Sequence, residues 1–241
     1  MVDLILMKKV FFVVAALLVI NILSFGIYFL YNHYVITKSL KNEGEYVVLL
    51  HGLGRTSLSM QRMGVHLAGE GYRVININYP GRRDSIENLV EKYVKPEIEE
   101  AYTDRNKKIN FVTHSMGGIM ARYFLAHNEL EGMHRLVMLA PPNKGSDTAD
   151  KWLGSRLVGR IMGPALEELS TDDESLVNTL PVPHYEVGVI AGEYDEKVSV
   201  ERTQLDNVQD FFIVPAEHTW IMNSPEVLDA VTFFLSEGKF K

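Results

Sequence analysis

The stretch that most constrains this chain is an apolar run that ends at a serine and two glycines. Residues 109–112 are typical of a buried strand, Ser115 follows them, and a helical pattern begins at Ile119. A serine on such a tight strand-to-helix turn is lifted off the strand end, and the first amides of the helix point toward it. Gly117 provides the small residue that the turn needs, whereas Thr113 stands where a glycine is usual. We therefore expect Ser115 to be a nucleophile.

Strands and helices alternate along the chain from residue 46 onward. Apolar runs predict strands at 46–50, 72–78, 109–112, 136–140, 185–190 and 210–214, and helices at 60–70, 85–102, 119–128 and 224–235. Buried strands that alternate with helices form a mainly parallel sheet with helices on both faces. Of the 241 residues, 46% are hydrophobic, which suffices for one such core but not for two large ones. We expect one α/β domain over residues 46–241 with about six strands.

Two segments depart from this simple alternation. Pro96 predicts a kink or break inside the helix at 85–102, for which Ser85 is the expected N-cap. Residues 146–183 carry apolar side chains at helical spacing, interrupted by glycines, and predict short helices. Two interpretations of 146–183 stay open at this point. The segment is either a helical cap that forms an apolar pocket over the site, or a helix pair packed in an ordinary crossover.

An uncharged apolar run at residues 10–31 precedes the domain. At about 1.5 Å per residue it is long enough to cross a bilayer core of about 30 Å. Tyr28, Tyr31 and Tyr34 at its end are typical of an interfacial aromatic belt. The alternative is a cleaved signal peptide, but the run is long for one and lacks a clear small-x-small cleavage site. We expect residues 1–35 to be an uncleaved single-pass membrane anchor and residues 36–45 to be a polar linker.

Lysines near the anchor bear on its orientation. Lys8 and Lys9 favour a cytoplasmic N-terminus, although Lys38 and Lys41 lie close on the other side. We expect the domain to lie on the periplasmic side of a bacterial inner membrane.

Composition excludes several classes of function. The formal net charge is -7 and no basic cluster occurs, so nucleic acid is not an expected partner. The chain has no cysteine, which excludes disulfides, thiolate catalysis and cysteine-bound zinc. Nothing in the composition indicates the oligomeric state.

Two later residues can complete the chemistry of Ser115. A serine nucleophile needs a base, and the base needs a carboxylate that holds its tautomer. His218 follows the last predicted strand, and Asp195 follows the strand before it, with Glu193 as a rival in the same loop. Because the carboxyl ends of parallel strands meet at one edge of the sheet, these loops should lie beside Ser115. We expect Ser115, Asp195 and His218 to be the catalytic residues.

A tetrahedral oxyanion also needs two backbone donors. The amide of Met116, at the start of the helix after the nucleophile, is one candidate. The amide of Leu53 is the other, because it follows the first strand and lies between Gly52 and Gly54, which let the backbone approach a substrate.

In this arrangement the chain resembles serine hydrolases of the α/β-hydrolase superfamily, and it is most similar to small bacterial lipases and esterases with an Ala-His-Ser-Met-Gly-Gly elbow. The stretches that carry the resemblance are 51–54, 113–118, 192–199 and 217–219, together with 141–146. The resemblance implies the α/β-hydrolase fold, with a reduced sheet, because the first antiparallel strands of the full-size fold have no room before residue 46. Residues 141–146 are expected to shape the floor of the pocket for the acid part of the substrate.

The expected reaction is hydrolysis of an acyl ester or a lipid-like substrate through an acyl-enzyme, with no metal or organic cofactor. One alternative is another acyl-group reaction on the same three residues, namely thioester or amide hydrolysis or acyl transfer. A second alternative, from a different class, is a non-catalytic membrane-anchored scaffold that keeps the fold.

Overall fold

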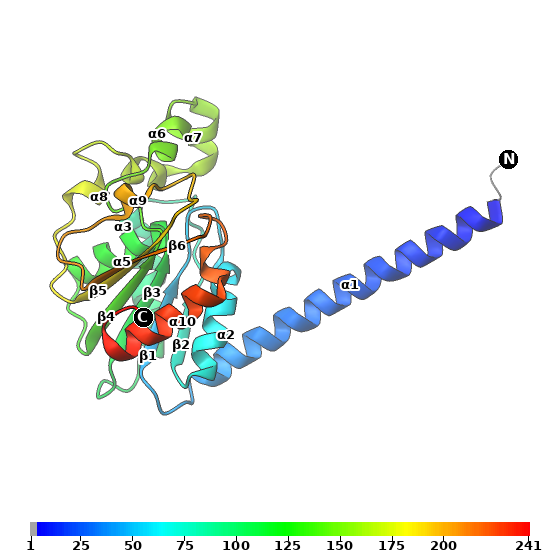
Figure 1. Ribbon diagram of the computed structural model, residues 1–241, viewed down its shortest axis with the longest axis horizontal. Coiled ribbons are helices and arrows are strands. Elements are labelled where there is room, and N and C mark those ends of the chain that lie inside the picture. The colour runs from blue at the N-terminus through cyan, green and yellow to red at the C-terminus, as the bar shows by residue number, and fades with distance from the viewer. Residues whose placement is uncertain (1–3) are drawn as a thin grey trace.

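In a computed structural model, which describes residues 4–241, the chain forms a six-stranded parallel sheet with helices on both faces (Figure 1). The strands are β1 (Tyr46–Leu50), β2 (Arg73–Ile77), β3 (Ile109–His114), β4 (Met133–Leu139), β5 (Glu186–Gly192) and β6 (Asp210–Val214). Their order is β2-β1-β3-β4-β5-β6, and every neighbouring pair is parallel. The predicted fold class is confirmed. The strand order reverses between β1 and β3, which is where parallel α/β sheets bind ligands.

The two faces of the sheet bury separate hydrophobic clusters. Val48 and Leu50 of β1 face the side covered by α3 (Ile86–Leu89), α4 (Lys95–Ala101) and α5 (Met116–His127). Val47 and Leu49 face the side covered by α2 (Gln61–Gly69) and α10 (Pro225–Glu237). Because side chains alternate along a strand, a strand that is buried on both faces must be apolar at every position. This explains why the strands appear in the sequence as continuous apolar runs.

The helix predicted at 85–102 continues through Pro96 without a break, but a π-helical segment interrupts its α-helical hydrogen bonding. Ser85 caps α3 by accepting a hydrogen bond from the amide of Asn88 (3.3 Å). The chain then widens into a π-helical turn, Val90–Val94, before α4 begins at Lys95. Proline lacks an amide donor and its ring crowds the preceding turn, so the wider turn directly before Pro96 is the expected response.

Residues 146–183 connect β4 to β5 and form four short helical elements. These are α6 (Asp147–Leu153), α7 (Arg156–Met162), the 3-10 helix η3 (Pro164–Leu169) and α8 (Leu176–Thr179). Figure 1 shows α6 and α7 beyond one end of the sheet rather than on either of its faces. The remaining elements are η1 (Ser57–Met60), α9 (Val200–Thr203) and η4 (Ile221–Asn223).

The N-terminal helix α1 (Leu4–Ser39) is continuous and projects from the domain (Figure 1). Its segment Met7–Ser39 is long and apolar enough to cross a membrane. The predicted linker at 36–45 needs a correction, because its first four residues continue the helix. Ile36 and Ser39 are buried, and Ser39 Oγ accepts a hydrogen bond from the amide of Val74 (3.0 Å) on the edge strand β2. Contact with the domain, rather than local composition, therefore sets the end of this helix.

Candidate active site

The turn between β3 and α5 presents Ser115. Its backbone has φ 53° and ψ −125°, in a region that residues other than glycine rarely adopt. A Cβ atom at Gly117 would lie 2.5 Å from the carbonyl oxygen of Leu50, so the start of α5 packs directly on the end of β1. The strained conformation and this close approach hold the Ser115 side chain off the end of the strand.

Thr113 fits the turn despite the usual preference for glycine. Its side chain is fully buried, and its hydroxyl donates a hydrogen bond to the carbonyl of Val137 on β4 (3.4 Å). The threonine hydroxyl therefore has a partner within the sheet.

Three side chains form one hydrogen-bonded chain. Ser115 Oγ lies 3.0 Å from Nε2 of His218, and Nδ1 of His218 lies 2.7 Å from Oδ2 of Asp195. The other oxygen of Asp195 accepts hydrogen bonds from the amides of Lys197 and Val198, both at 2.8 Å. Because a carboxylate only accepts, His218 carries its proton on Nδ1, and Nε2 is left to accept the Ser115 proton. The Asp195 side chain is fully buried and that of His218 is 7% exposed, so little water competes for these bonds.

Glu193 takes no part in this chain. Its amide still pairs with the carbonyl of Val214 on β6 (2.8 Å), and the residue is exposed. The turn begins one step later, where the amide of Asp195 donates to the carbonyl of Gly192 (3.4 Å). Asp195 is therefore the acidic residue in this loop that faces His218.

A cavity of about 70 Å³ lies beside Ser115 and His218. Trp152 of α6, together with Leu166 and Leu169 of η3, forms its apolar wall. Of the two readings of residues 146–183, these contacts favour the cap. Within residues 4–241, no three His, Asp or Glu side chains converge as metal ligands.

The two expected oxyanion residues lie in the same region. Leu53 lines this cavity together with Ser115. Met116 is the first residue of α5 and is fully buried.

His114 is a buried neighbour of His218 for which the sequence pattern predicts no role. Its Nε2 lies 3.0 Å from the backbone carbonyl oxygen of His218, and the two rings are 4.9 Å apart. Burial, and then the nearby His218, hold the pKa of His114 well below its usual range, so the ring is neutral and donates one hydrogen bond to that carbonyl. His114 thus holds the backbone at His218 in place. In the sequence, only the position of His114 directly before Ser115 points to such a role.

Arg122 of α5 is a second buried residue that the sequence did not single out. Its guanidinium donates to Asn143 Oδ1 and to the carbonyl of Leu180, both at 3.2 Å. Asn143 Nδ2 in turn donates to the carbonyl of Thr203 (2.9 Å). Burial lowers the pKa of Arg122 to about 10, which leaves it charged at neutral pH. These bonds tie the 141–146 loop, next to the site, to the helix that follows the serine.

Comparison with known proteins shows the family to which this fold belongs. Residues 45–180 match the family described as the alpha/beta hydrolase fold. No curated protein matches the sequence significantly. Among solved structures, the mature lipase of Bacillus licheniformis superposes with a TM-score of 0.58 and 17% identity, covering 80% of this chain and 91% of the lipase. An esterase from Pyrococcus furiosus superposes with a TM-score of 0.61 and 21% identity, covering 81% of this chain and 83% of the esterase. A phospholipase from Legionella pneumophila superposes with a TM-score of 0.60 and 18% identity, covering 78% of this chain and 57% of the phospholipase.

Proposed function

Because this chain belongs to the α/β-hydrolase fold family, and because Ser115, His218 and Asp195 form one hydrogen-bonded chain, we propose that it is a serine hydrolase that cleaves carboxylic esters. The observation that carries the proposal is the 3.0 Å contact between Ser115 Oγ and Nε2 of His218, with Asp195 on the far side of the ring. A hydroxyl, a base and an orienting carboxylate in this order are what acyl transfer from a weak nucleophile requires.

The proposed reaction proceeds through an acyl-enzyme. Nε2 of His218 takes the hydroxyl proton while Ser115 Oγ attacks the ester carbonyl carbon. The tetrahedral intermediate collapses, its bond to the alcohol oxygen breaks, and His218 gives its proton to the departing alcohol. Water, deprotonated by the same ring, then hydrolyses the acyl-enzyme and restores Ser115. Asp195 keeps the ring in the required tautomer and stabilises its charged form.

Two backbone amides are proposed to bind the oxyanion. The amide of Met116 belongs to the first turn of α5, where the helix leaves its amides without internal partners. Leu53 lines the cavity beside Ser115. Donors of this kind, held in place before the reaction, supply the largest single contribution to many acyl transfers.

The proposed substrate is an acyl ester or a lipid-like small molecule, as the resemblance to small bacterial lipases and esterases implies. Apolar residues of the proposed cap at 146–183 line the cavity, which favours an apolar acyl group. Residues 1–35 are proposed to anchor the enzyme in a bacterial inner membrane, with the hydrolase domain at 46–241 on the periplasmic side. The length and hydropathy of α1 support the anchor.

A fluorophosphonate probe tests the nucleophile directly, because it labels serines that are activated by a base. Wild type is expected to be labelled and Ser115→Ala is not, while Ser170→Ala, which removes another buried serine, keeps its labelling. Labelling that persists in Ser115→Ala would falsify the assignment.

A substrate panel then separates the reaction types. Turnover of p-nitrophenyl esters above that of acyl-CoA and amide substrates is expected. Faster turnover of thioesters or amides would move the enzyme to one of those classes. Absence of both turnover and labelling in folded protein would instead indicate a non-catalytic scaffold.

Protease added to spheroplasts tests the orientation. A periplasmic domain is digested under these conditions, whereas a protected domain would place the enzyme on the cytoplasmic side.

A further inference from the structure

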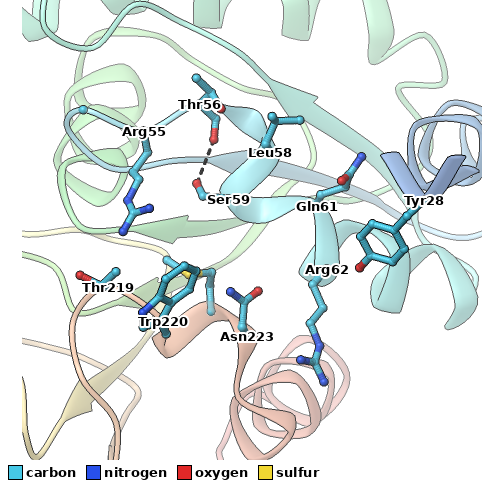
Figure 2. Close-up of a pocket in the computed structure, with 12 residues that line it drawn as sticks. Tyr28, Arg55, Thr56, Leu58, Ser59, Gln61, Arg62, Thr219, Trp220 and Asn223 are labelled. Atoms are coloured by element: carbon cyan, nitrogen blue, oxygen red, sulfur yellow. Dashed lines mark hydrogen bonds between the residues drawn. The ribbon is translucent and has the colours of Figure 1, made fainter. Parts of the chain in front are cut away.

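A groove of about 560 Å³ lies between the membrane helix and the active site (Figure 2). Three separate parts of the chain line it, namely Tyr28 of α1, residues in the range 54–62, and residues in the range 219–223. Figure 2 shows Arg55 and Trp220 on one side of the groove and Tyr28 and Arg62 on the other. The proposed ester-hydrolysis mechanism uses none of these four side chains.

The groove is positively charged although the whole chain is acidic. Its only charged lining residues are Arg55 and Arg62, and no carboxylate in residues 4–241 pairs with either within 4.0 Å. The guanidinium of Arg55 lies 5.5 Å from the centre of the Trp220 ring, a cation–π contact that holds it in place. Two guanidiniums without protein counter-ions suit an anionic ligand, and their planar donor sets match phosphate oxygens.

The position of Tyr28 relates the groove to a bilayer. From Val10 to Tyr28 most apolar side chains of α1 are exposed, and from Phe29 onward one face of the helix contacts the domain, where Gln61 Nε2 donates to the carbonyl of Phe29 (3.3 Å). Leu30, Tyr31 and Tyr34 on the other face stay exposed. A bilayer core of about 30 Å that begins at Val10 ends close to Tyr28, at about 1.5 Å per residue. The groove then opens at the level of the lipid headgroups, where tyrosine and tryptophan rings are most stable. Trp220 and Leu58, which are 60% and 48% exposed, lie at the same groove.

The groove adjoins the catalytic cavity. Arg55 lines both spaces, and Thr219, which lines the groove, directly follows His218. Lys197 lines the cavity and donates to Thr219 Oγ1 (2.9 Å), which adds a further cation at the boundary. A ligand whose charged end lies between the arginines has the remainder of its structure next to Ser115.

We propose that this groove binds the phosphate-bearing headgroup of an anionic glycerophospholipid from the bilayer that holds α1. The proposal rests on the membrane anchoring stated above, and it deepens the proposed function by naming the class of lipid held at the site. Arg55 and Arg62 bind the phosphate, and Trp220 and Tyr28 contact the glycerol region. A zwitterionic headgroup binds less well, because its own cation lies among the arginines.

Tryptophan fluorescence can report binding, because the chain has two tryptophans and Trp220 belongs to the groove. The experiment uses the full chain in detergent with Ser115→Ala, which removes turnover, and Trp152→Phe, which removes the other signal. Short-chain dihexanoyl phosphatidylglycerol is expected to give a saturable change in fluorescence. Dihexanoyl phosphatidylcholine and dihexanoylglycerol are expected to bind at least about tenfold more weakly, since a lost charge-assisted contact costs about that factor.

Variants assign the binding to the two arginines. Arg55→Gln and Arg62→Gln are each expected to raise the Kd for the phosphatidylglycerol about tenfold, and the lysine variants recover part of it because the charge remains. Arg83→Gln is the matched control, since Arg83 is exposed but does not line the groove, and it leaves the Kd unchanged. If Trp152→Phe prevents folding, retention of phosphatidylglycerol over phosphatidylcholine by the Ser115→Ala chain in native mass spectrometry replaces the fluorescence readout.

Three outcomes would overturn the proposal. The first is equal affinity for anionic and neutral lipids, and the second is an affinity that neither arginine affects. The third is competition by inorganic phosphate as strong as by the lipid, which would make the ligand a free anion. Since binding is measured without turnover, failure of ester hydrolysis in the wild type leaves these results interpretable by themselves.

Discussion

The strained backbone of Ser115 leads to a prediction about stability that does not depend on activity. Replacing Ser115 by alanine removes the hydroxyl but keeps a Cβ atom at φ 53° and ψ −125°. Replacing it by glycine also removes the Cβ atom, and so releases the strain. The difference in the free energy of unfolding between Ser115→Gly and Ser115→Ala therefore measures what the turn stores.

The magnitude follows from opposing contributions. A residue other than glycine in such a region costs about 1–3 kcal/mol. Against this release, glycine loses about 0.5–1 kcal/mol through the greater freedom of the unfolded chain, and a lost buried methyl group costs about 0.8 kcal/mol. Ser115→Gly should therefore lie between about 1 kcal/mol less stable and about 2 kcal/mol more stable than Ser115→Ala. Without strain, glycine would be the less stable by about 1.3–1.8 kcal/mol.

Ala121→Gly provides the matched comparison, since Ala121 is fully buried in α5, six residues along the same element. There the same change has no strain to release and should destabilise the chain by about 2 kcal/mol, from helix propensity and the lost methyl group. Urea unfolding of the full chain in detergent, followed by circular dichroism, gives both differences. Two differences in the free energy of unfolding are compared: Ser115→Gly against Ser115→Ala, and Ala121→Gly against wild type. If glycine is destabilising by the same amount in both, the turn stores no strain.

Three further predictions follow from buried groups. Asp195→Asn should lower kcat/KM for p-nitrophenyl esters by about four orders of magnitude with little change in KM, because His218 is left in the wrong tautomer. Burial lowers the pKa of His51 from 6.5 to about 4, so on acidification the unfolded chain takes up a proton before the folded chain does. The free energy of unfolding should therefore fall by up to about 3 kcal/mol as the pH is lowered from 6.5 to about 4, as measured by urea midpoints. His51→Gln should flatten that fall, and an unchanged slope would contradict the assignment to His51. Arg122→Met should lower the free energy of unfolding in urea by about 3 kcal/mol, because Asn143 and the carbonyls of Val177 and Leu180 lose their donor. A near-neutral result would show that the network contributes no stability.

The fold was largely predictable because its strands are buried on both faces. The runs at 46–50 and 210–214 coincide with β1 and β6, since polar residues or a proline bound each stretch. β4 begins at Met133, three residues before the predicted start at 136. The polar residues at the start of β4 can belong to the strand because the Arg135 side chain has partners elsewhere in the chain. It donates a hydrogen bond to the carbonyl of Leu235 (2.8 Å) and lies beside Glu186. Hydropathy along the chain contains no information on such distant partners.

The candidate site also contains residues that the sequence predicts and residues that it does not. Ser115, Asp195 and His218, which the structure brings into contact, are the residues that chain order singles out, because each follows a strand and parallel strands end at one edge. The roles of His114 and Arg122 depend on where distant carbonyls lie. The carbonyl of His218 is 104 residues from His114 in the chain, and no pattern around His114 indicates it. Sequence reasoning finds side chains whose chemistry is rare, and it misses those whose partners are backbone atoms.

The junction between α1 and the domain connects these points to function. Residues 32, 36 and 39 form one buried face of the helix, yet two of the three are polar, so no apolar stripe marks the contact. The contact is nevertheless close, because a Cβ atom at Gly64 would lie 2.9 Å from Cδ1 of Ile36, and Ser39 accepts from the open edge of the sheet at Val74. A flexible linker would let the domain turn freely above the membrane. With α1 as the proposed membrane anchor, a docked helix is instead expected to fix the height of the groove at Arg55 and Arg62 relative to the bilayer.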